Sequence, residues 1–165
     1  MRRRASVAFL YGAAAIVYVL DRLSKAWAEA TLAGGAPIDL IPGVLRLSFV
    51  RNTGGAFSLG QRAPLVFAAA TAIIASVIVV ASARPHRRGI AISLGMILGG
   101  AVGNLTDRAV HGPGFTGPVT DFIDLHVWPV FNLADSAVVL GALALVLLTA
   151  REEPGRGERA GAVAP

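Results

Sequence analysis

The sequence predicts a membrane all-α protein with four transmembrane helices, both termini in the cytoplasm, and a small β-type segment on the outer membrane surface between the first two helices. Composition is the first observation behind this prediction. Of the 165 residues, 55% are hydrophobic and 15% are charged, and the mean hydropathy is +0.65. Such values are typical of a chain that spends most of its length in lipid rather than in water.

Four long apolar stretches are the second observation. They run from Val7 to Trp27, from Pro64 to Ala83, from Gly89 to Thr106 and from Val130 to Ala150. As helices rising about 1.5 Å per residue, they can cross roughly 30 Å of hydrocarbon. The first resembles a cleaved secretory signal, but it is longer than a typical signal and the later spans need it to set their orientation. We expect residues 1–150 to form one four-span membrane domain, followed by a flexible cytoplasmic tail at 151–165.

The distribution of arginine is the third observation, and it predicts the orientation. Clusters precede the first span, separate the second from the third, and follow the fourth: Arg2, Arg3 and Arg4; Arg84, Arg87 and Arg88; Arg151, Arg156 and Arg159. Because basic residues are enriched in short cytoplasmic loops, all three clusters belong inside. This bias and the attraction to anionic lipid headgroups account for the net charge of +5, so no nucleic-acid partner is expected.

One segment between the first two spans has the period of a strand. From Val44 to Val50, Leu and Phe alternate with Arg and Ser, and the turn residues Pro42-Gly43 and Gly54-Gly55 flank the segment. We expect a small sheet on the outer membrane surface, with its apolar face toward lipid and its polar face toward water. An irregular loop is the alternative.

Five polar motifs fall where the predicted spans meet the outer face. They are DRLSK from Asp21, RNTGGAF from Arg51, GGAVGNLTDR from Gly99, VTDFID from Val119 and FNLADS from Phe131. A charged side chain at the centre of a spanning helix costs about 2.5 to 3.5 kcal/mol, so such groups usually face a protein interior or a wet cavity. Five motifs in one layer therefore predict a functional site.

Helical spacing groups these polar residues into pairs that share a helix face. The pairs are Asp21 with Lys25, Asn104 with Asp107 and Arg108, and Asn132 with Asp135. The third span also carries small residues at every fourth position, namely Gly95, Gly99 and Gly103, which let a neighbouring helix approach closely. Packing alone explains these glycines, so we assign them no chemistry.

The five motifs, in this order, resemble those of the lipoprotein signal peptidases (signal peptidase II), which are membrane aspartic endopeptidases of bacteria. The resemblance runs from Asp21 to about Gly141. Position by position, it implies that Asp121 and Asp135 are the catalytic aspartates. It implies further that Asn52, Asn104, Arg108 and Asn132 bind the substrate, and that Asp21, Lys25, Gly54, Gly55 and Asp107 have structural or supporting roles.

The resemblance also implies a substrate and a location. The substrates would be prolipoproteins carrying a diacylglyceryl-modified cysteine, cut at the outer face of the bacterial plasma (inner) membrane, with membrane lipids as the other partners and no cofactor or metal. Two segments depart from the family: the stretch from His111 to Pro118 is longer than expected and the stretch from Asp124 to Phe131 is shorter. These departures concern the loop on the substrate side rather than the two aspartates.

Aspartate chemistry is consistent with the residues themselves. Two carboxyls that share one proton can hydrolyse a peptide bond, one activating water while the other protonates the carbonyl oxygen. Asp121 and Asp135 are 14 positions apart, about 21 Å on one helix, so the chain has to bend between them. Pro129 favours such a bend, which would put Asp135 one turn inside the fourth span beside Asp121 from the preceding loop.

Other functions remain open from the sequence alone. A small proton- or ion-coupled transporter is the main alternative, because Asp, Asn and Arg also line ion pathways. A transporter should carry polar residues at several depths and inverted repeats, whereas this chain has one polar layer and no visible repeat. A non-catalytic scaffold is a third reading. A zinc protease is not favoured, because the sequence has no HExxH motif. A Ser/Lys protease is not favoured either, because Ser24 is adjacent to Lys25 and so does not face it on a helix.

Overall fold

The structure is a computed structural model, and it describes residues 2–53 and 64–150. The Gly54-Gly55 turn and the tail expected at 151–165 lie outside the described residues. The elements in chain order are α1 (Arg2–Leu32), β1 (Ile38–Ile41), β2 (Leu45–Asn52), α2 (Pro64–Ala81), α3 (Arg88–Val110), the 3-10 helix η2 (Pro113–Phe115), β3 (Val119–Asp124) and α4 (Leu133–Ala150).

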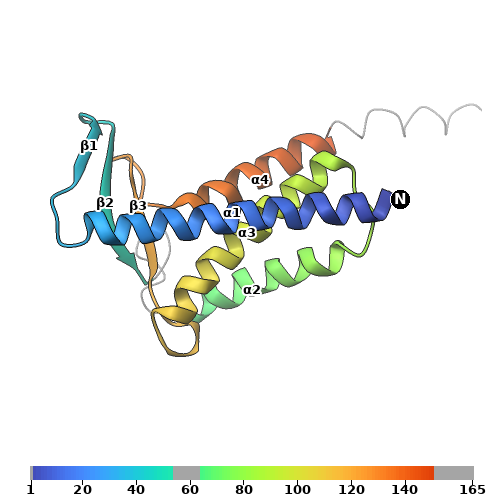
Figure 1. The fold of residues 1–165 in the computed structure, drawn as a ribbon, viewed down its shortest axis with the longest axis horizontal. Coiled ribbons are helices and arrows are strands. Elements are labelled where there is room, and N and C mark those ends of the chain that lie inside the picture. The colour runs from blue at the N-terminus through green and yellow to red at the C-terminus, as the bar shows by residue number, and fades with distance from the viewer. Residues whose placement is uncertain (1, 54–63, 151–165) are drawn as a thin grey trace, which may run out of the picture.

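Within these described ranges, four helices are long and apolar enough to cross a membrane, as the sequence predicts. Figure 1 shows the helices forming one bundle with the strands gathered at one end. The beginning of α1, the connection from α2 to α3 and the end of α4 all lie at the opposite end. The beginning of α1 and the end of α4 thus lie at the same end of the bundle, as an even number of spans requires.

Helix α3 is the central helix of the bundle. Half of its most apolar window is buried, against 17–22% for the other three helices. Its glycines explain why the neighbours approach so closely: a Cβ at Gly99 would lie 2.5 Å from the Ala14 carbonyl oxygen of α1, and one at Gly100 would lie 2.5 Å from the Ala134 oxygen of α4. The predicted close approach of a neighbouring helix along the small residues is thus confirmed on two sides of α3.

The strand predicted at Val44–Val50 is confirmed as β2 and extends to Asn52. It is the middle strand of a three-stranded sheet, whose other two strands were not predicted. The order is β1-β2-β3, with both pairs antiparallel. The prediction that Asp121 comes from a loop is wrong, because VTDFID is strand β3 and Asp121 pairs with Val50 of β2.

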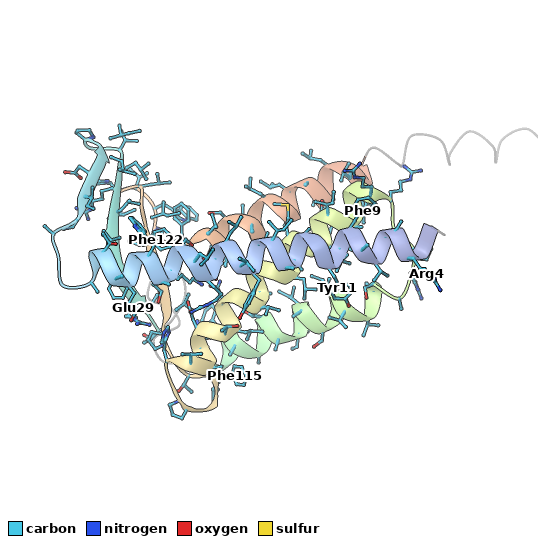
Figure 2. All side chains as sticks on the ribbon, viewed as in Figure 1. Arg4, Phe9, Tyr11, Glu29, Phe115 and Phe122 are labelled. Atoms are coloured by element: carbon cyan, nitrogen blue, oxygen red, sulfur yellow. The ribbon has the colours of Figure 1, made fainter. Side chains whose placement is uncertain are left out.

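The expectation that the apolar face of this sheet contacts lipid is also wrong. Leu47, Phe49 and Ile123 pack against a cluster of buried residues consisting of Ala28, Leu32 and Phe122. Helix α1 continues to Leu32, beyond the predicted end of its span at Trp27, and so offers a protein surface for the sheet to cover. Figure 2 shows Phe122 beside the end of α1 that lies nearest the strands.

The fourth helix begins at Leu133 rather than at Val130, because the residues before it pair with β3. Phe131 donates its N–H to the carbonyl oxygen of Ile123 at 3.0 Å, and Ile123 donates back to Phe131 at 2.8 Å. The chain therefore bends after Pro129, as predicted. The bend places Asn132 and the first turn of α4 directly beside β3.

Candidate active site

Asp121 of β3 and Asp135 of α4 line the same cavity, which has a volume of about 260 Å³. Three of the predicted substrate-binding residues, Asn52, Asn104 and Arg108, also line it. The fourth, Asn132, is fully buried next to the cavity and contacts both aspartates. The structure thus gathers residues from β2, α3, β3 and α4 around one small space.

The carboxyl of Asp121 is buried and held by two amides. Asn52 donates from Nδ2 to Oδ2 at 2.8 Å, and Asn132 donates from Nδ2 to Oδ1 at 2.7 Å. The pKa of Asp121 is raised to about 7, mainly by burial and also by the nearby charge of Asp135, although the two amide donors act to lower it. Asp121 therefore exchanges a proton near neutral pH, as an acid or base in catalysis needs to do.

Asp135 lies in the first turn of α4, where it takes part in a reciprocal cap. Asn132 Oδ1 accepts the N–H of Asp135 at 2.9 Å, and Asp135 Oδ2 accepts the N–H of Asn132 at 3.3 Å. This is the capping-box arrangement, which satisfies two backbone donors at once. Because its oxygen is used in the cap, the amide nitrogen of Asn132 is directed at Asp121, so one residue fixes both carboxyls.

A buried ion cluster lies next to the two aspartates. The ammonium of Lys25, 2% exposed, lies 2.9 Å from Asp21 Oδ2 and 3.0 Å from Asp107 Oδ2. It also donates to Asn104 Oδ1 at 2.9 Å. Arg22 forms a further ion pair with Asp107. The predicted i,i+4 pairing of Asp21 with Lys25 is confirmed.

Three hydrogen bonds connect this cluster to the catalytic layer. Asp107 accepts the N–H of Thr120, the residue before Asp121, at 3.1 Å. Asp21 accepts the N–H of Ala134, the residue before Asp135, at 3.1 Å.

The third connection runs through Asn104. The ammonium of Lys25 can only donate, so the Asn104 oxygen faces it and the Asn104 nitrogen faces Asp135 Oδ1, at 2.8 Å. Asn104 also shares its oxygen with the amide nitrogen of Asn132, at 3.2 Å. The amide of Asn104 is thereby fixed in one orientation.

Arg108 links the cavity to the loop that follows α3. Its guanidinium donates to the carbonyl oxygen of Gly117 at 3.3 Å, and the N–H of Gly117 donates to the Arg108 oxygen at 3.2 Å. The loop from His111 to Pro118 therefore folds back on the end of α3, with His111 Nδ1 3.1 Å from the Pro118 oxygen. Part of this loop forms η2, and both aspartates line the shared cavity.

Several residues of the site were not predicted from the sequence. Phe67 and Thr71 of α2 and Trp128 line the cavity. Helix α2 carries no polar motif, so the sequence does not distinguish its residues that face the cavity from those that face lipid. Arg22 had a signal, since it is a third charge within the DRLSK motif of a spanning helix, but no partner could be named for it. Gly54 and Gly55 lie outside the described residues.

Comparison with known proteins gives a consistent result. Residues 13–151 match the family model described as Signal peptidase (SPase) II. The lipoprotein signal peptidase of Streptomyces coelicolor is 42% identical over 151 residues, which cover 91% of this chain and 74% of that protein. That of Pelotomaculum thermopropionicum is 36% identical over 155 residues, which cover 92% of this chain and 99% of that protein.

Solved structures share the fold. One, described as a bacterial membrane enzyme determined by the in meso method at 2.3 Å resolution, has a TM-score of 0.74 at 26% identity and covers 89% of this chain and 90% of its own. A second, with the same description at 1.9 Å resolution, has a TM-score of 0.70 at 27% identity and covers 85% and 91%.

Replacing Lys25 tests the ion cluster. Lys25→Met removes the cation that faces two fully buried carboxylates, so we expect a loss of about 3–5 kcal/mol in the free energy of unfolding. The control is Arg51→Gln, which breaks the partly exposed pair with Glu29 and should cost less than about 1 kcal/mol. Unfolding of the purified proteins in detergent micelles measures both, and equally small losses would contradict the role given to Lys25.

Proposed function

This chain belongs to the signal peptidase II family, and we propose that Asp121 and Asp135 form its catalytic pair. It is a membrane protease that, like the lipoprotein signal peptidases to which it is similar, removes signal peptides from lipoproteins. One observation carries the assignment of the pair: two carboxyls from separate elements, each held by amide donors, line a single cavity.

In the proposed mechanism the two carboxyls share one proton. Asp121, with a pKa of about 7, carries the proton at the start of the cycle, and Asp135 is the carboxylate. Asp135 takes a proton from water as the water oxygen attacks the carbonyl carbon of the scissile bond, while Asp121 gives its proton to the carbonyl oxygen. Collapse of the tetrahedral intermediate returns a proton to Asp121 and transfers the other from Asp135 to the leaving amine.

The neighbouring polar residues differ in their contacts. Asn52, Asn104 and Asn132 each donate to a catalytic carboxyl and so hold it in position. Asn52 and Arg108 line the cavity from β2 and α3, and we assign them to binding the substrate as well. A guanidinium is a fixed cation with forked donors, suited to the carbonyl groups of a peptide or of a lipid ester.

We place the catalytic pair at the outer face of the plasma membrane, acting on precursors modified with diacylglycerol on cysteine. The support is the separation of charges along the bundle. Figure 2 shows Arg4 at the end opposite Glu29 and the strands, and Figure 1 shows the connection that contains Arg84 and Arg87 at that same end. A cytoplasmic location for this basic end leaves the catalytic cavity outside.

The transporter considered from the sequence has no support. The matching family is a peptidase family. Among the described residues, the buried charged side chains all lie in the layer next to the sheet and none lies deeper along a pathway: Asp21, Lys25, Asp107, Arg108, Asp121 and Asp124.

Removing either catalytic carboxyl should abolish turnover. In Asp121→Asn and in Asp135→Asn the pair can no longer hold a shared proton, so we expect cleavage of a lipid-modified precursor peptide to fall at least about a thousandfold while the protein still folds. Asp124→Asn is the matched control. Asp124 lies in the same strand but bonds Arg46 and the N–H of His126, so its variant should keep most activity. Near-normal cleavage by either catalytic variant would sink the assignment.

The pH dependence follows from the raised pKa of Asp121. Turnover should decline as the pH rises through about 7, because the pair then loses its shared proton. Asn52 donates to the ionised carboxyl and so lowers this pKa. In Asn52→Ala the protonated form should persist to higher pH, which moves the alkaline limb of the kcat/KM profile upward. The neighbouring change Arg51→Gln should leave the limb in place, and an unmoved or lowered limb in Asn52→Ala would refute the argument.

The proposed orientation can be tested with single cysteines, because the chain contains none. Cysteine at Thr116 or Arg46, near the catalytic end, should react in intact spheroplasts with a membrane-impermeant maleimide. Cysteine at His86, in the α2–α3 connection, should react only after the membrane is permeabilised. The reverse labelling pattern would invert the topology and remove the basis for an outer-face peptidase.

A further inference from the structure

A second cavity lies at the end of the bundle opposite the catalytic pair. Its volume is about 390 Å³, and its walls are the beginning of α1 and the connection between α2 and α3. It shares no lining residue with the catalytic cavity. Figure 2 shows Phe9, one of its walls, at the same end as Arg4. The peptidase chemistry leaves this cavity without a role.

Hydrogen bonds between elements hold the walls of the cavity in place. The N–H of His86 donates to the buried hydroxyl of Ser6 at 2.9 Å, joining the α2–α3 connection to α1. The ring nitrogen Nε2 of His86 lies 2.9 Å from the carbonyl oxygen of Ala81. One turn along, the hydroxyls of Tyr11 and Ser82 are 3.1 Å apart. The cavity is therefore built into the fold and does not depend on a loose surface loop.

The lining of the cavity is basic. Arg87 and Arg88 both line it, and no Asp or Glu is among its described lining residues. The guanidinium carbon of Arg88 lies 4.7 Å from the centre of the Phe9 ring, which holds this cation over an apolar wall. Arg87 is the N-cap of α3 and makes no side-chain cap, so the first backbone N–H groups of that helix add positive potential at the same place.

The depth of the cavity matches the headgroup layer of a bilayer. Helix α3 has 23 residues and is therefore about 34 Å long, slightly more than the hydrocarbon core. With its polar residues Asn104 and Arg108 at one boundary, its first residue, Arg88, lies at the other. Phe9 and Pro85 provide the apolar wall against which the start of an acyl chain can pack.

We propose that this cavity binds the phosphate of an anionic membrane phospholipid in the leaflet opposite the catalytic site. The guanidinium groups of Arg87 and Arg88 bind the phosphate oxygens, as arginine does at other phosphate sites. The acyl chains run along the apolar exterior of α1 beside Phe9. Basic pockets between transmembrane helices on the cytoplasmic side are known to suit such headgroups. The inference is independent of the identity of the catalytic residues.

The experiment measures lipid retained by the purified full chain. Native mass spectrometry in detergent micelles, titrated with phosphatidylglycerol or with phosphatidylcholine, gives an apparent affinity for each lipid. We expect the protein to retain phosphatidylglycerol in preference to phosphatidylcholine. The double variant Arg87→Gln/Arg88→Gln should weaken phosphatidylglycerol binding about 30-fold, because each variant position loses the charge-assisted hydrogen bonds that its guanidinium makes to the phosphate oxygens.

The matched control separates a site from a diffuse charge effect. Arg4→Gln/Arg84→Gln removes the same two charges at the same end, from residues that do not line the cavity, and should change the affinity by less than about threefold. Equal weakening by both double variants would overturn the proposal. Cleavage activity of each variant verifies folding, since these residues lie far from the catalytic pair.

Free phosphate is the other source of the same chemistry, and a competition distinguishes the two. Inorganic phosphate at millimolar concentration should not displace phosphatidylglycerol, because it lacks the acyl chains that pack beside Phe9. Full displacement would show a site for phosphate ions and would contradict the assignment to a lipid.

Discussion

The ammonium of Lys25 imposes the constraint on which the rest of the structure depends. A cation buried in a helix bundle costs several kcal/mol unless it is paired, so carboxylates have to reach it. Asp21 and Asp107 do so from α1 and α3, and this requires the two helices to lie in close contact. Gly103 makes the contact possible, because a Cβ there would collide with the Asp21 carboxylate. The glycines of α3 therefore serve the ion cluster as well as the packing of helices.

The carboxylates that pair with Lys25 also hold the backbone beside the two catalytic aspartates in position. Asp107 and Asp21 each use one oxygen to accept a backbone N–H, from Thr120 and from Ala134. Each of these residues immediately precedes a catalytic aspartate. The main chain is thus fixed at the positions from which the two carboxyls project, and the amides of Asn104 and Asn132 then fix the carboxyls themselves. Positioning by backbone contacts leaves few rotamers open, which favours a preorganised site.

A feature of this fold was predictable from the sequence when it depends on residues that are close together in the chain. The spans, the polar layer and the Asp21–Lys25 pair were predictable, because hydropathy and helical spacing act within a few residues. Strands β1 and β3 were not. Five of the six residues of β3 are buried, including Thr120 and Asp121, so its sequence shows no polar face. The packing of the sheet on α1 and the contribution of Thr71 to the cavity depend on contacts between distant segments, which local periodicity cannot encode.

The helix lengths explain how the catalytic cavity can be accessible from lipid. Helix α4 has 18 residues, about 27 Å, and Asp135 lies in its first turn, so its carboxyl sits at the boundary of the hydrocarbon rather than at its centre. Asn52 of β2 and Asp121 of β3 line the same cavity, and burial of the Asp121 carboxyl is the main cause of its raised pKa. A precursor anchored by acyl chains would then meet the carboxyl pair at the depth where its lipid ends. Withdrawal of the precursor from the bilayer would be unnecessary, and the energy of burying its chains would be retained throughout the reaction.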